Sequence, residues 1–263
     1  MAEPLIYGYG KDAVAVYRTD GRDLLACEVR LEAQGEAFLT SFTEGDNSLV
    51  VATDSMKNFI HRTALDFRGD SMEDFLAEVG RRFLDRYDHV ERVYVNGREV
   101  PFAQNGDVRQ RIWDDVAVAW IDVSRTGVEQ NVCGIENLRL LKLRGSSFTG
   151  FVRDEYTTLP EAEDRPLQVH MTVRWRNADF ARRAAPETVR TTVVTTYGDF
   201  VSESIQHLLH EIGRRMLATH AEIEEVLLTG ENRLWDTGAE GGGVTVYTEP
   251  RPPFGVIRLT LRR

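Results

Sequence analysis

Glu78–Leu84 reads EVGRRFL, and Glu211–Leu217 reads EIGRRML, 133 residues further along the chain (211 minus 78). The register continues in both directions without a gap. Downstream, HVERVYVNG from His89 aligns with EIEEVLLTG from Glu222. Upstream, the apolar positions Met72, Phe75 and Leu76 align with Ile205, Leu208 and Leu209. One offset therefore joins a helix face, a Gly-Arg-Arg and the strand that follows, which predicts a tandem duplication of one module.

Each half of the chain has the pattern of two strands, a helical segment and two more strands. This predicts an α+β fold with two antiparallel ββααββ modules, residues 1–130 and 131–263, each with its helices on one sheet face. Unpaired sheet edges are a liability, which favours closure by oligomerisation. In the first module the expected elements are strands at Lys11–Tyr17, Leu24–Leu39 (with a turn at Gly35), Ser48–Ala52 and Val90–Val95, helices at Met56–Ala64 and after a cap at Ser71, and a turn at Asn96-Gly97.

The composition indicates a globular protein that binds neither nucleic acid nor a membrane. Hydrophobic residues make up 42%, charged residues 28%, and the net charge is −10. Cys27 and Cys133 are isolated, which predicts buried thiols in a reducing compartment. The sequence has no apolar run of membrane length, and neither MAEPLIYGYG at the start nor TLRR at the end reads as a targeting signal. We therefore expect a cytoplasmic protein.

Ser147–Arg165 reads SFTGFVRDEYTTLPEAEDR and carries the chemistry of a site for a flat, anionic heterocycle. The ring of Phe148 could stack on one face of the ligand, and Leu159 could add an aliphatic contact. The guanidinium of Arg165 could direct two donors onto carbonyl or anionic oxygens. The alternative interpretation of this stretch is a strand, a proline turn and a surface arginine.

Further segments, spread from Tyr9 to the C-terminus, resemble those of the urate oxidase (uricase) family. They are YGKD at Tyr9–Asp12, VVATDSMKN at Val50–Asn58, the Phe148–Arg165 stretch, SIQ at Ser204–Gln206 and PFGVI at Pro253–Ile257. The resemblance implies tandem tunnel-fold (T-fold) modules that form an oligomeric barrel with a central tunnel, expected here to be a homotetramer.

The resemblance also implies an enzyme that oxidises urate or a related purine-like heterocycle with O2, without a cofactor or a metal. Lys11 and Thr53 would form a proton relay, in which the lysine accepts the proton of the threonine hydroxyl. Catalytic Asn232 would sit over the ring. The expected substrate-binding residues are Asp54, Phe148, Leu159, Arg165, Ile205, Gln206 and Leu234. Lys11 and Thr53 would come from one subunit, and Arg165 and Gln206 from the next.

Each of these polar residues also has a plain structural interpretation. Lys11 could be a solvated strand lysine, Thr53 a helix cap, and Gln206 an exposed position on an amphipathic helix.

The sequence departs from the family pattern at Leu234, two residues after Asn232, where the family has a histidine. Leucine can neither donate, accept nor relay a proton. A shift of the alignment by one residue would place Arg233 there, which is not a histidine either. A second hypothesis is therefore a uricase-fold protein without redox activity, either a binding protein or a non-redox enzyme for a purine- or pterin-like ring. Its metal-dependent pterin form is disfavoured, because the sequence has no H-x-H.

Overall fold

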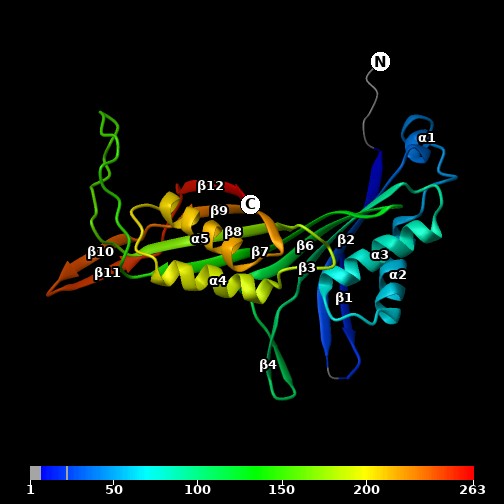
Figure 1. Ribbon diagram of the computed structural model, residues 1–263, viewed down its shortest axis with the longest axis horizontal. Helices are drawn as coiled ribbons and strands as arrows, with labels where there is room; N and C mark the ends of the chain where they lie inside the picture. The colour runs from blue at the N-terminus through cyan, green and yellow to red at the C-terminus, as the bar shows by residue number, and fades with distance from the viewer. Residues whose placement is uncertain (1–6, 22) are drawn as a thin grey trace. The chain divides into compact units, whose positions relative to one another are not determined.

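The structure, a computed structural model, describes residues 7–21 and 23–263 (Figure 1). The chain divides into two compact units, Met1–Cys133 and Gly134–Arg263. The strand β7 (Gly127–Lys142) crosses the boundary between them. The expectation about a targeting signal at the N-terminus falls mainly on residues 1–6, which lie outside the described part of the chain.

The first unit is an antiparallel sheet with helices on one face. Its strands pair in the order β1 (Gly8–Thr19), β2 (Leu24–Gln34), β3 (Arg92–Glu99) and β6 (Val116–Ser124). Helices α2 (Thr53–Asp66) and α3 (Met72–Arg86) lie along this sheet (Figure 1). Burial alternates along β3, as expected for a sheet with one covered face. The shorter elements are η1 (Glu36–Phe38), α1 (Leu39–Thr43) and a hairpin of β4 (Phe102–Asn105) and β5 (Val108–Arg111).

The second unit repeats this plan. The strand β8 (Leu167–Asn177) pairs antiparallel with β9 (Ile223–Asn232), which pairs with β12 (Gly255–Arg262). Its helices are α4 (Pro186–Asp199) and α5 (Ile205–Thr219), and its hairpin is formed by β10 (Asp236–Gly241) and β11 (Val244–Thr248). The chain order β1-β2-α2-α3-β3-β6 is followed by β7-β8-α4-α5-β9-β12, which confirms the expected α+β fold with ββααββ twice. The assignment of T-fold modules to residues 1–130 and 131–263 stays a prediction.

The glycine of the repeated Gly-Arg-Arg has the same packing role in each unit. A methyl group added at Gly80 of α3 would stand 2.7 Å from Cγ2 of Val123, and one at Gly213 of α5 would stand 2.7 Å from Cδ1 of Leu261. In each helix the glycine therefore lets the helix approach the sheet closely. The capping serines repeat as well, because Ser71 accepts a hydrogen bond from the backbone of Asp74 and Ser204 accepts one from His207.

The second arginine after each glycine links the two helices of its unit. Arg82 of α3 pairs with Glu78 on its own helix and reaches Asp66 of α2 at 3.3 Å. The second unit repeats the arrangement 133 positions later, with Arg215, Glu211 and Asp199. Hydrogen bonds from Arg214 and then Arg215 lower the pKa of Glu211 to about 2. The duplicated motif therefore has a structural role: it links the two helices of each unit by ion pairs.

Gly80 provides a test of this close approach. Alanine is normally favoured over glycine inside a helix by about 1 kcal/mol. At position 80 the methyl group would overpack the helix–sheet interface, so we expect Gly80→Ala to lower the free energy of unfolding by about 1–3 kcal/mol. Nothing lies within 4 Å of a methyl group added at Gly198 of α4, so Gly198→Ala should be stabilising. Urea unfolding of both variants measures the difference, and equal stabilisation by the two substitutions would contradict the argument.

Several local expectations from the sequence are wrong. The strand expected over Leu24–Leu39 ends at Gln34, and Glu36–Phe38 form the helix η1. Ser48–Ala52 is not a strand, because its amide groups are used elsewhere: Val50 donates to the carbonyl of Asn47, and Val51 donates to the hydroxyl of Tyr9 at 2.6 Å. Helix α2 accordingly starts at Thr53 rather than Met56. Asn96-Gly97 is not a turn but part of β3, where a methyl group at Gly97 would meet Leu76 Cδ1 at 2.7 Å. Glycine at this position leaves room for the Leu76 side chain of helix α3, which packs against the strand.

The expected burial of the two cysteines is confirmed. Cys27 and Cys133 are both free and buried, and burial raises the pKa of the Cys27 thiol to about 12. None of the helices in the described residues is both long enough and apolar enough to cross a membrane.

Candidate active site

A bulge in β1 sets the direction of Lys11. Lys11 pairs with Leu31, but the next paired residues are Val14 and Val29, so β1 holds one residue more than β2 between these pairs. Within this bulge Ala13 has a positive φ of 54°. Leu31 and Val29 are both buried on the helix-covered face, and residues directly opposite in a sheet share a face. The bulge therefore turns Lys11 toward the face covered by α2, with its side chain partly exposed.

Thr53 and Asp54 begin α2, next to the same end of β1. The hydrogen bond from Val51 to the Tyr9 hydroxyl holds the chain before α2 against β1. Ala52 is the N-cap of α2 and no side chain caps it, so the interpretation of Thr53 as a helix cap is wrong. The Thr53 side chain is exposed. The pKa of Asp54 is lowered, first by the hydrogen bond from Lys57 and in smaller part by the charge of Lys11. The structure thus brings Lys11, Thr53 and Asp54 into one region of the first unit.

The segment between β7 and β8 carries Phe148 and Arg165 and forms a long irregular loop (Figure 1). Phe148 exchanges two backbone hydrogen bonds with Ala162, at 2.7 and 3.1 Å, and Arg165 donates to the carbonyl of Ser146 at 2.9 Å. These bonds place the Arg165 guanidinium carbon 5.6 Å from the centre of the Phe148 ring. Long ordered loops of this kind are usually functional.

Arg165 is half-buried, and part of its guanidinium group lacks a hydrogen-bond partner. Its Nε atom is buried and has no hydrogen-bond partner among the described residues. Burial lowers the pKa of its guanidinium, the direction expected when a cation loses water without gaining a counter-charge. A buried donor of this kind gains from an anionic ligand that supplies the missing acceptor. The buried Nε distinguishes Arg165 from a fully solvated surface arginine, and its role in binding stays a prediction.

The start of α5 is joined to the same loop. Ser147 donates to the carbonyl of Ser202 at 2.9 Å, and Ser202 donates to the carbonyl of Gly145 at 3.0 Å. Three residues beyond Ser202, Ile205 is buried, and the side chain of Gln206 is exposed at the first turn of α5. Phe148, Arg165 and the Ile205-Gln206 pair are thus held by one hydrogen-bonded network of the second unit. Leu159 lies further out on the loop, with 39% of its surface exposed.

Asn232 and Leu234 lie at the end of β9. Asn232 is the last residue of that strand, and its Oδ1 atom is buried without a hydrogen-bond partner among the described residues. Leu234 follows in the irregular segment before β10 and is half-buried. Between them, Arg233 packs its guanidinium 3.5 Å from the centre of the Phe254 ring and pairs with Glu231. Arg233 is thus occupied by structural contacts.

The comparison with known proteins decides the family. The sequence profile described as Uricase matches residues 7–108 and 131–258. The chain belongs to the uricase family. It is 38% identical to the "Uric acid degradation bifunctional protein PucL" of Bacillus subtilis, over 97% of this chain and 60% of that protein. It is 37% identical to the uricase of Halalkalicoccus jeotgali, over 97% of both chains.

The solved structures agree with this family. The urate oxidase of Bacillus sp. TB-90 superposes with a TM-score of 0.93 at 34% identity, covering 98% of this chain and 100% of that one. The chain spans 60% and 58% of the length of the bifunctional relatives from Bacillus subtilis and Bacillus sp. TB-90. The T-fold expected from the uricase resemblance is thereby confirmed.

Two features near the candidate site were not evident in the sequence. Phe151 stacks on Phe148, with ring centres 4.8 Å apart and planes 12° apart, so one face of Phe148 is already covered. The sequence showed two aromatic residues three positions apart, but not that they stack on each other. The other feature is the buried Lys142, whose position at a strand end gives no local signal.

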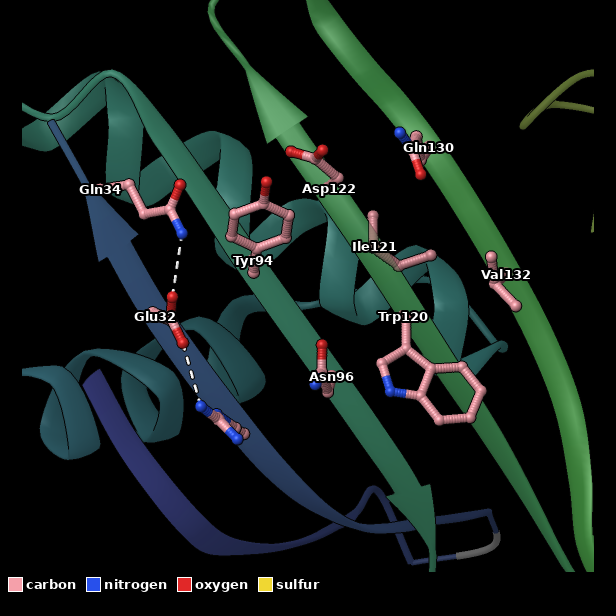
Figure 2. Close-up of a pocket in the computed structure, with 10 residues that line it drawn as sticks. Glu32, Gln34, Tyr94, Asn96, Trp120, Ile121, Asp122, Gln130 and Val132 are labelled. Atoms are coloured by element: carbon pink, nitrogen blue, oxygen red, sulfur yellow. Dashed lines mark hydrogen bonds and ion pairs between the residues drawn. The ribbon is translucent and has the colours of Figure 1, made fainter. Parts of the chain in front are cut away.

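A cavity of about 380 Å³ lies elsewhere in the first unit. Figure 2 shows that lining side chains such as Glu32, Tyr94 and Trp120 lie on the sheet face opposite the helices. Glu32 there accepts hydrogen bonds from Arg30 at 3.0 Å and Gln34 at 2.9 Å. The lining residues are Arg30, Glu32, Gln34, Tyr94, Asn96, Trp120, Ile121, Asp122, Gln130 and Val132. Lys11, Thr53 and Asp54 do not line it, so this cavity is not the expected uricase-family site.

Proposed function

We propose that this protein is a cytoplasmic, cofactor-independent oxidase that uses O2 to oxidise urate or a closely related purine-like ring. The observation that carries the proposal is the half-buried Arg165, whose buried Nε has no hydrogen-bond partner in the described structure and whose guanidinium lies beside the Phe148 ring. The family match and the names of the relatives support urate as the ring.

The proposed mechanism divides the work between binding and proton transfer. Arg165 and Gln206 hold the edge of the ring, Phe148 packs against it, and Ile205 and Leu159 line it. Lys11 accepts the proton of the Thr53 hydroxyl, which in turn accepts a proton from the substrate or a water molecule. The deprotonated ring is electron-rich and supplies the electrons to O2, so the chemistry needs neither a flavin nor a metal. Asn232, whose amide oxygen is buried, would orient O2 or water above the ring.

One assay tests the function. Purified protein is mixed with urate in air, and the ultraviolet absorbance of urate is followed together with O2 uptake. We expect the absorbance to fall while O2 is consumed. Leu234 favours a second candidate, a uricase-fold protein that binds a purine- or pterin-like ring without oxidising it. Tight binding of urate without O2 uptake would support this second candidate and refute the oxidase.

We also propose that the active protein is a homo-oligomer, expected to be a homotetramer, with sites shared between subunits. Each unit has an edge strand, β1 in the first and β12 in the second. Pairing of such edges between copies would satisfy their exposed backbone hydrogen-bonding groups and close the sheets into a barrel. In this arrangement Lys11 and Thr53 of one subunit would serve the Arg165 loop of another.

Subunit mixing tests the shared site. Lys11→Met and Arg165→Ala should each be inactive alone, because each site would lack one component. In mixed oligomers some sites would combine the intact halves of both variants, so we expect part of the parent activity to return. Activity is measured before and after the two proteins are unfolded and refolded together. No recovery in oligomers shown to be mixed, or a parent chain that is monomeric at micromolar concentration, would contradict the proposal.

A further inference from the structure

Lys142, the last residue of β7, is a buried lysine that the proposed mechanism does not use. Only 8% of its surface is exposed. Its ammonium donates to the carbonyl of Phe200 at 2.8 Å and lies 3.3 Å from the hydroxyl of Ser202. Lysine is almost never this buried unless its charge is paired or hydrogen-bonded, because removing an ammonium from water is costly. The burial of this ammonium therefore indicates that it has a specific role in the structure.

The contacts of Lys142 meet where the proposed binding residues are joined. Ser202, its hydroxyl partner, is the residue whose backbone pairs with Gly145 and Ser147 at the start of the Phe148 loop. Two residues further, Ser204 caps α5, which begins with Ile205 and Gln206. The ammonium thus lies under the junction between the Phe148–Arg165 loop and the start of α5.

Two other groups complete the surroundings of Lys142. Asp164, the neighbour of Arg165, accepts hydrogen bonds from Gly145 at 2.7 Å and Ser146 at 3.3 Å, and its charge acts on Lys142. Tyr197 of α4 places its ring centre 5.7 Å from the ammonium and donates its hydroxyl hydrogen to the carbonyl of Leu167 at 2.7 Å. Both ends of the binding loop are therefore anchored around one buried cation.

We propose that Lys142 is a positioning residue, whose ammonium holds the Phe200–Ser202 turn so that Arg165 and Phe148 face the same ligand as Gln206. Lys142 itself does not touch the substrate. The inference rests on the proposed function only for the identity of the ligand. Lys142 aligns binding groups and takes no part in proton transfer. Its loss is therefore expected to change KM more than kcat.

Lys142→Met tests this role, because methionine keeps much of the aliphatic length and removes the ammonium. We expect the KM for urate to rise about tenfold or more, a size that small misplacements of binding groups produce, with kcat changed by less than about twofold. Arg144→Met is the matched control: it removes an exposed positive charge two residues away and should leave both constants unchanged. A fall in kcat at constant KM, or no change in either constant, would overturn the proposal.

Two further measurements keep the test independent of folding and of catalysis. Ser202→Ala removes the hydroxyl partner but keeps the Phe200 contact, so a smaller rise in KM is expected even if Lys142→Met fails to fold. Hydrogen exchange of the Ser147, Phe148 and Ser202 amides needs no turnover, and these amides should exchange faster in both variants. If the parent neither oxidises nor binds urate, the proposed function fails while the exchange still reports on Lys142. A lower unfolding temperature with unchanged exchange and unchanged KM would show a purely structural role and overturn the inference.

Discussion

Arg165→Ala is expected to weaken the binding of urate and other planar anions by about 2–5 kcal/mol, which corresponds to roughly a 30- to 5,000-fold loss of affinity. The reason is the state of the guanidinium in the free chain. Its Nε is buried without a hydrogen-bond partner in the described structure, so the cost of desolvation is already present before the ligand arrives. A ligand that supplies an acceptor recovers that cost on binding.

The measurement is equilibrium binding of urate under anaerobic conditions, so that oxidation does not remove the ligand. Arg153→Ala is the matched control, because Arg153 is an exposed arginine of the same loop that also lies near an aromatic ring, 5.6 Å from the centre of Phe151. It should bind urate as the parent does. Equal affinity of the parent and Arg165→Ala for every planar anion tested would rule out Arg165 as the clamp.

The second large effect concerns Leu234. If this leucine replaces a proton-relaying histidine, the parent chain should oxidise urate about 10²–10⁴-fold more slowly than a uricase that has the histidine, the usual contribution of general acid–base catalysis. In addition, a polar edge of the substrate left without a hydrogen bond against the leucine would weaken the binding free energy by roughly 1–3 kcal/mol. A ring that presents a C–H or methyl group to this side would be favoured over urate.

Leu234→His should raise the turnover of urate, because it adds a donor and acceptor two residues beyond Asn232. Leu234→Phe is the control, since phenylalanine introduces a ring that cannot relay a proton, and it should give no gain. Both variants are assayed beside the parent for urate oxidation and for urate binding. A parent chain that already oxidises urate at the rate of a histidine-containing uricase would show that the histidine is dispensable here.

Much of the candidate site was accessible from the sequence because its residues stand in contiguous motifs. Phe148 and Arg165 were expected in one pocket, and backbone pairing does place the guanidinium near the ring. Their roles, and those of Lys11, Thr53, Asn232 and Gln206, stay predictions. Lys142 was not expected, because its burial comes from Phe200 and Ser202, about sixty residues away in sequence, and no local pattern encodes such a contact.

The sequence by itself determined the duplicated architecture. The spacing of apolar residues and the cap at Ser71 are local or periodic features, and they predict helix and strand without knowledge of the partner segments. The tertiary structure alone decided the direction of Lys11, the irregular path of Ser48–Ala52 and the burial of the Arg165 Nε atom. Each of these depends on a contact with a segment distant in sequence. Lys11 depends on the register between β1 and β2, Ser48–Ala52 depends on the Tyr9 hydroxyl, and Arg165 depends on the pairing of Phe148 with Ala162. A backbone amide bonds to whichever acceptor the folded chain presents, so propensity at such positions yields to long-range contacts.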